Sequence, residues 1–76
     1  MVVRLSDPNL AEELLGHLRR ADCAATLAEV GAHVNGVVFN VEVPAALDEH
    51  QARLELGLYL RTWEAVNPGS GAELLD

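Results

Sequence analysis

The feature that most limits how this chain folds is the dipeptide Asn35-Gly36, which separates two apolar segments. Asn-Gly is typical of the two-residue turn of a β-hairpin, because both turn residues adopt positive φ there. Pairing the flanking segments across this turn places Val34 opposite Val37 and continues outward in steps of two. One face of the hairpin then carries only apolar side chains: Ala28, Val30, Ala32, Val34, Val37, Phe39, Val41 and Val43. The alternation predicts two strands and a sheet with one buried face.

The other face of this hairpin is polar. The same register places Glu29 opposite Glu42, a like-charge pair that destabilises a sheet. Arg4, on a neighbouring strand, is expected to relieve the repulsion. Phe39 points to the buried face, so no aromatic side chain is left outside to stack on RNA bases. Paired carboxylates can serve acid–base catalysis, but nothing in the sequence forms a pocket around them.

A single long helix is the competing interpretation of the segment before the turn. Ala21, Ala25 and Ala28 recur at helical spacing, which allows one helix over about 8–30. We favour the hairpin, because alternation over both of its strands is hard to obtain by accident. It predicts extended backbone over residues 23–34, and a helix that continued through Ala25 would contradict it.

The segment before the hairpin predicts a strand and then a helix. Residues 2–5 are β-rich, and Asp7-Pro8 marks a helix start, with Asp7 as N-cap and Pro8 in the first helical position. One apolar face follows at helical spacing: Leu10, Leu14, His17, Leu18 and Ala21. Acidic residues early and basic residues late suit the dipole of this helix.

A second, longer helix follows the hairpin. Asp48 is a good N-cap, with Gln51 three residues on in a capping-box-like arrangement. Leu47 is placed to form a hydrophobic staple with Ala52. The helix reaches about residue 66, because Asn67-Pro68-Gly69 stops it.

The order of elements is strand, helix, strand, strand, helix and, as an alternative for the tail, a last strand. We expect one α+β domain over residues 1–67, with 68–76 either a disordered tail or a short edge strand through residues 72–75. This order resembles the ferredoxin-like architecture, an antiparallel sheet with two helices on one face. The resemblance is to a fold shared by many functions and implies no activity.

The long helix has two apolar stripes. At about 100° per residue, one stripe faces the core: Ala52, Leu56, Tyr59, Leu60 and Trp63. On the opposite side lie Leu54, Leu58 and Ala65. The second stripe contacts the first helix, is exposed without a role, or forms a subunit interface, and we favour the interface. Gly57 either admits a close approach by another backbone or is a tolerated helix glycine.

Charge and composition exclude several classes of function. The 76 residues carry a formal charge of −7, from 12 acidic and 5 basic residues, and every basic residue is Arg. A nucleic-acid binder needs a basic stripe and an anionic membrane attracts positive charge, so we expect neither partner. No signal peptide and no apolar run near 20 residues is apparent. We expect a cytoplasmic protein.

No residue pattern predicts a catalytic, cofactor-binding or metal site. Cys23, His17, His33 and His50 form no pair with metal-ligand spacing. Asp22 precedes Cys23, and this negative neighbour raises the thiol pKa instead of activating the thiol. We therefore expect Cys23 to be structural, and we expect neither an enzyme nor a bound cofactor.

The function expected from the sequence is a small interaction or regulatory domain. Small domains without disulfides or metals are commonly stabilised by oligomerisation. We expect a homo-oligomer, with a dimer favoured, through an interface at Leu54, Leu58 and Ala65; another protein partner is the alternative occupant. The alternative function is a small-molecule sensor, with a ligand between subunits as in ACT-like regulators.

Overall fold

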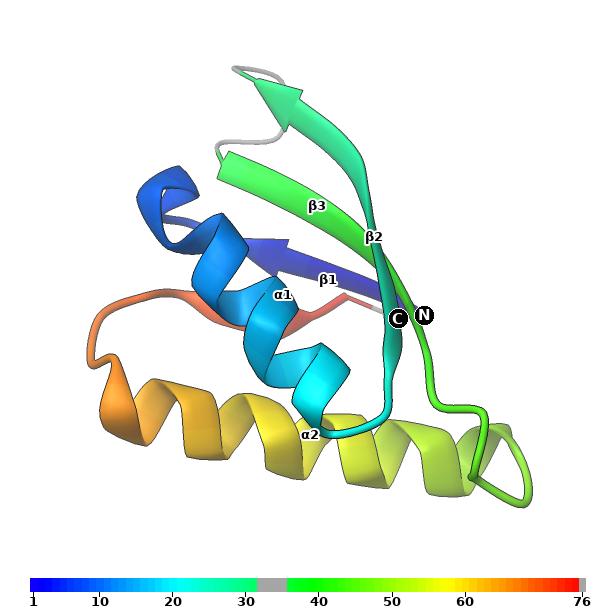
Figure 1. Cartoon of the computed structure of the whole chain (residues 1–76). Helices are drawn as coiled ribbons and strands as arrows, with labels where there is room; N and C mark the ends of the chain where they lie inside the picture. Colours follow the sequence, from blue (N-terminus) through cyan, green and yellow to red (C-terminus); the bar gives the residue numbers. More distant parts are fainter. Residues whose placement is uncertain (32–35, 76) are drawn as a thin grey trace.

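The computed structural model describes residues 1–31 and 36–75. The chain forms a small α+β domain with two helices and a four-stranded antiparallel sheet in the order β2-β3-β1-β4 (Figure 1). The elements are β1 (Val2–Leu5), the 3₁₀ turn η1 (Pro8–Leu10), α1 (Ala11–Arg20), β2 (Ala24–Gly31), β3 (Gly36–Glu42), α2 (Glu49–Val66) and β4 (Ala72–Leu74). The fourth strand that the sequence left open is therefore present.

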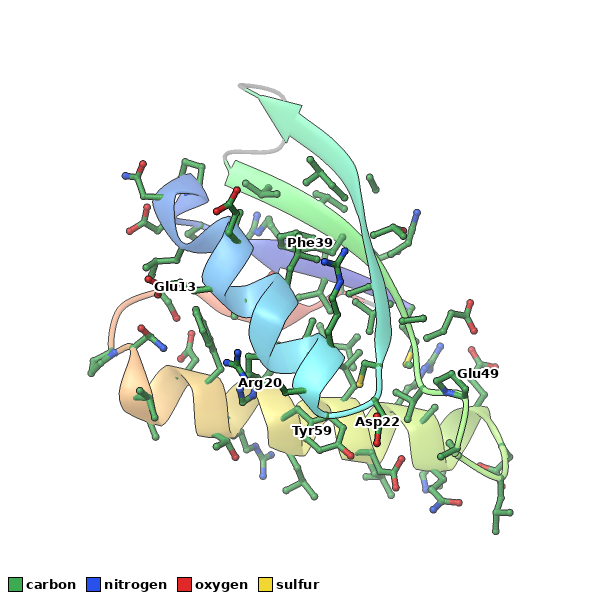
Figure 2. All side chains as sticks on the ribbon, in the orientation of Figure 1. Glu13, Arg20, Asp22, Phe39, Glu49 and Tyr59 are labelled. Carbon is green, nitrogen blue, oxygen red and sulfur yellow. The ribbon has the colours of Figure 1, made fainter. Side chains whose placement is uncertain are left out.

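Both helices cover the same face of the sheet (Figure 1). Alternate residues of the two central strands are buried on that face, and Phe39 lies between the sheet and α1 (Figure 2). The two helices bury side chains in the same core: Leu14, Leu18, Leu56, Leu60 and Trp63. The predicted core stripe of the long helix is confirmed, with Tyr59 partly buried at its edge.

The hairpin interpretation is confirmed and the single long helix is wrong. α1 ends at Arg20, and Asp22 adopts a left-handed conformation with φ of 62°. The Cys23 N–H donates to the Leu18 carbonyl (2.9 Å), and the Asp22 N–H donates to the Arg19 carbonyl (3.1 Å). This is the Schellman ending of a helix, with Asp in the place more often taken by Gly. The helix therefore ends before Ala25 and Ala28, whose helical spacing suggested that it continues.

The register of the hairpin differs from the expected one. Val30 pairs with Val37 instead of Val41, and Gly31 pairs with Gly36. Val37, Phe39 and Val41 face the core as expected. Before the irregularity, however, Val41 pairs with Ala25 instead of Val30, an odd slip that exchanges the two faces of β2. Ala25 is therefore buried, and Ala28, which was expected on the apolar face, is exposed. Residues 32–35, for which the sequence predicted pairing and the turn at Asn35, lie outside the described residues. His33 is among them.

An irregularity in β2, between Leu27 and Glu29, accompanies this change of register. Glu29 pairs with Val38, and Glu42 pairs with Ala24, so the expected facing of Glu29 and Glu42 is wrong. An inserted residue of this kind is a β-bulge, which alternation alone does not reveal.

The ends of the long helix follow the predicted capping, with one correction. The Gln51 N–H donates to the Asp48 carboxylate (2.8 Å), and the Leu47 N–H donates to the Gln51 side-chain oxygen (3.1 Å). At the other end, the Asn67 N–H donates to the Trp63 carbonyl (2.8 Å). The expected staple between Leu47 and Ala52 is wrong, because Leu47 is 89% exposed.

Two carboxylates hold β4 against the rest of the domain. The Glu64 carboxylate accepts a hydrogen bond from the Ala72 N–H at 2.9 Å, which ties α2 to the start of β4. On the open face of the sheet, Arg4 pairs with Glu73 at 3.1 Å. Arg4 was expected to relieve the repulsion between Glu29 and Glu42, and in the structure it pairs instead with Glu73 in the edge strand β4.

Candidate functional site

The outward face of α2 brings together the three residues singled out from the sequence. Leu54 and Leu58 are each 59% exposed, and Ala65 is exposed two turns further on. α1 packs on another side of α2, where His17 Nε2 lies 3.0 Å from the Tyr59 carbonyl oxygen. Contact with α1 therefore does not account for the leucine stripe.

A shallow depression lies beside these leucines. Its volume is about 360 Å³, and it is lined by Arg53, Leu54, Gly57, Leu58 and Arg61. A Cβ built on Gly57 would meet nothing within 4 Å. No part of the described chain needs a glycine there, so the open space above Gly57 is available to an approaching group.

Exposed apolar side chains gather at α2. The described chain has six large exposed ones: Leu27, Leu47, Leu54, Leu58, Val66 and Leu75. Two of these six belong to the α2 stripe, and Leu47 and Val66 flank the two ends of the same helix. Scattered surface leucines need no explanation, whereas Leu54 and Leu58 lie on successive turns of one helix face.

The charges around this face are unevenly placed along α2. The first turn is acidic, with Asp48 as the cap and Glu49 after it, and Glu49 forms an ion pair with Arg53 at 3.2 Å. Arg61 stands on the rim of the depression, beyond the leucines. Asp48 therefore carries the net negative charge of the first turn, because Glu49 (labelled in Figure 2) is paired with Arg53. The guanidinium groups of Arg53 and Arg61 both line the depression.

The chain has no significant match among protein-family models, curated proteins or solved structures. Within residues 1–31 and 36–75, no helix combines the length and the apolar character needed to cross a membrane. The exposed face of α2 is the feature on which a function for this chain can be argued.

His17, His50 and Cys23 do not come together in the described chain. His17 lies between the helices, its ring centroid 5.8 Å from that of Trp63, and His50 is exposed in the first turn of α2. His33 lies outside the described residues. Among those described, no group of three His, Cys, Asp or Glu side chains is placed to hold a metal ion.

Cys23 is buried, with 5% of its surface exposed, and it lies just before β2. Burial raises the pKa of its thiol above the ordinary value, and the carboxylates of Glu55 and Asp22 raise it further. The thiolate is the reactive form of cysteine, so this environment suppresses nucleophilic chemistry. The sequence indicated the effect of Asp22, but burial, which is the larger cause, came from the fold.

We expect Cys23 to react with a thiol reagent at pH 8 at least about tenfold more slowly in the folded protein than in concentrated urea. Its raised pKa means that the folded chain holds the thiol proton more tightly than the unfolded chain. The contribution of Cys23 to stability is then complete below about pH 8.5 and falls as the pH rises further. Urea titrations at several pH values, with Cys23→Ala as control, measure this loss. Equal labelling rates in both states would contradict it.

Sequence reasoning found the leucines of this face but missed the depression beside them. Leu54, Gly57, Leu58 and Arg61 follow one another at spacings of three, one and three residues, so they surround one point on the helix surface. This spacing was readable from the sequence. That the depression stays open depends on the tertiary structure, because no other element within residues 1–31 and 36–75 covers Gly57.

Proposed function

We propose that this domain is a small non-enzymatic interaction module that forms a homodimer through the α2 face, which comprises Leu54, Gly57, Leu58, Arg61 and Ala65. The observation that carries the proposal is the exposure of two leucines on successive turns of a helix whose other side is buried in the core. A helix on a two-layer domain needs only one apolar face. The second face is explained if another molecule covers it.

We also assign the domain to the ferredoxin-like arrangement. The strand, helix, strand, strand, helix, strand order supports this assignment, as does a sheet in which β1 and β3 are central. This architecture hosts many functions, so the assignment positions the α2 face without naming an activity.

The small size of the chain supports association as its function. A domain of this length buries a limited share of its surface on folding, and oligomerisation is a common source of further burial. The net charge of −7 favours solubility of the remaining surface and disfavours binding to nucleic acid. A two-fold contact between identical faces is the commonest form that such association takes.

Sedimentation equilibrium across roughly a hundredfold range of protein concentration tests the proposal. We expect a reversible dimer for the natural chain. The double variant Leu54→Glu, Leu58→Glu should be monomeric with an unchanged circular dichroism spectrum, because two buried carboxylates in each subunit would be strongly unfavourable at the interface.

The matched control is Leu27→Glu, Leu75→Glu, which alters two exposed leucines away from α2. This control should dimerise like the natural chain. A natural chain that stays monomeric throughout, or an α2 double variant that dimerises normally, would refute the proposed interface.

A further inference from the structure

We propose that the two copies meet with their α2 helices antiparallel and with the two-fold axis near residue 56. In this arrangement Leu54 of each copy inserts into the depression around Gly57 of the other. The inference rests on the self-association proposed above and adds the orientation and the contact that specifies it.

The shape of the depression fits a helix side chain. Leu54, Gly57, Leu58 and Arg61 form a diamond on the helix surface, and they line the observed depression. A diamond of four residues is the hole that accepts one knob when two helices pack. Because Gly57 has no side chain, the floor of this hole is backbone, and a leucine is the usual knob.

Two-fold symmetry requires that the knob and the hole lie on the same helix. Leu54 lies about one turn before the centre of the hole. Antiparallel helices related by an axis near residue 56 bring Leu54 of one copy opposite Leu58 of the other, over the Gly57 hole. The same operation repeats the contact on the other side of the axis, so both leucines of both copies are covered.

Charge favours the antiparallel orientation over the parallel one. The antiparallel arrangement brings Arg61 near Gln51 of the second copy, beside the first turn of α2. Glu49 of that turn is paired with Arg53, so Asp48 carries its net negative charge. A parallel arrangement would instead place Arg61 against Arg61 of the second copy. Like charges across a helix pair are unfavourable, whereas opposite charges set partner orientation.

The size of the contact indicates a weak dimer. α2 has 18 residues, so it is about 27 Å long, and a helix is about 10 Å wide. A contact confined to this helix buries no more total surface than the lower limit of stable interfaces, which is about 1,200 Å². We therefore expect dissociation in the micromolar range, with monomer and dimer in exchange.

Disulfide trapping distinguishes the two orientations. Gln51→Cys and Arg61→Cys are made separately in a Cys23→Ala background, and the two proteins are oxidised alone and mixed. We expect a heterodisulfide between positions 51 and 61 in the mixture and little homodisulfide of either protein. In the antiparallel dimer the two copies of each position lie about 15 Å apart along the helices.

Homodisulfides at both positions without the heterodisulfide would overturn the antiparallel inference and leave the proposed dimer intact. A monomer in sedimentation equilibrium would refute both proposals.

Substitution of Gly57 gives a second test that does not depend on trapping. Gly57→Ala should raise the melting temperature by about 4–8 °C, because alanine favours the helix and its Cβ meets nothing in the chain. Gly57→Leu fills the hole with a good helix former, so it should weaken dimerisation at least tenfold while the monomer stays folded. Dimerisation by Gly57→Leu that is as strong as that of the natural chain would overturn the insertion of Leu54.

Discussion

Leu56→Ala is expected to lower the free energy of unfolding by about 2–5 kcal/mol. Leu56 has no exposed surface and lies on the core stripe of α2. Its truncation removes buried apolar contacts and leaves a cavity that the close-packed neighbours fill only in part. Small domains have total stabilities of about 5–15 kcal/mol, so this one change should remove a large fraction of the stability.

The matched control is Leu54→Ala, the same substitution two residues earlier on the same helix. Leu54 is exposed in the monomer, so the stability of the monomer should change by no more than about 0.5 kcal/mol. Urea unfolding, at a protein concentration below that of dimerisation, measures both values. Equal losses for the two variants would mean that α2 does not present these opposite faces to the core and to solvent.

The second large effect is expected for Gly36→Ala. Gly36 begins β3 with φ of +142°, a conformation that L side chains rarely adopt, and a Cβ there would overlap the Leu5 carbonyl oxygen. The conformational strain is worth about 1–3 kcal/mol, and the overlap with backbone adds about 1–3 kcal/mol. We therefore expect a loss of about 2–6 kcal/mol.

Gly69→Ala separates the two causes. Gly69 also has positive φ, +80°, but a Cβ there would meet nothing within 4 Å. Its substitution should cost only the conformational strain, about 1–2 kcal/mol. Thermal and urea unfolding of both variants give the comparison, and a larger loss at Gly69 than at Gly36 would show that the contact between β3 and Leu5 is not as described.

Substitutions that destabilise the folded monomer and substitutions on the α2 face should have independent effects on unfolding and on dimerisation. Changes at Leu56 and Gly36 affect the folded monomer, because both residues lie where elements of one chain meet. Changes at Leu54 and Leu58 should affect association alone. A double variant, Leu54→Glu with Leu56→Ala, would therefore unfold with the midpoint of Leu56→Ala and fail to dimerise.

Local signals in the sequence were enough to predict most elements. Asp48 caps α2 as expected, since an N-cap needs only its own neighbours. Asp7 caps the 3₁₀ turn η1 instead of the α-helix, which begins at Ala11 with Leu10 as its N-cap. The buried stripe that includes Leu56 and Trp63 followed from helical periodicity. The exposed leucines of α2 were predictable as a second stripe for the same reason, and no element among the described residues covers them.

Contacts between distant segments were not predictable in the same way. The left-handed conformation of Asp22 ended the first helix, although the alanine spacing suggested continuation. The strand pairing differs from the register that an Asn35-Gly36 turn predicts, and Arg4 pairs with Glu73 of the neighbouring strand. The strand pairing and the ion pair depend on what another part of the chain offers, whereas the helix ending at Asp22 is made by local bonds to Leu18 and Arg19.

The sequence by itself determined the extent and the core-facing side of the long helix and the apolar face of β3, because capping and periodicity are local properties. Only the tertiary structure decided the hairpin register, the burial of Cys23 and the open depression at Gly57. Register depends on the neighbouring strand, and burial depends on which surfaces remain uncovered after packing. The proposed dimer belongs to this second group, because it requires a face of α2 that no part of the described chain covers.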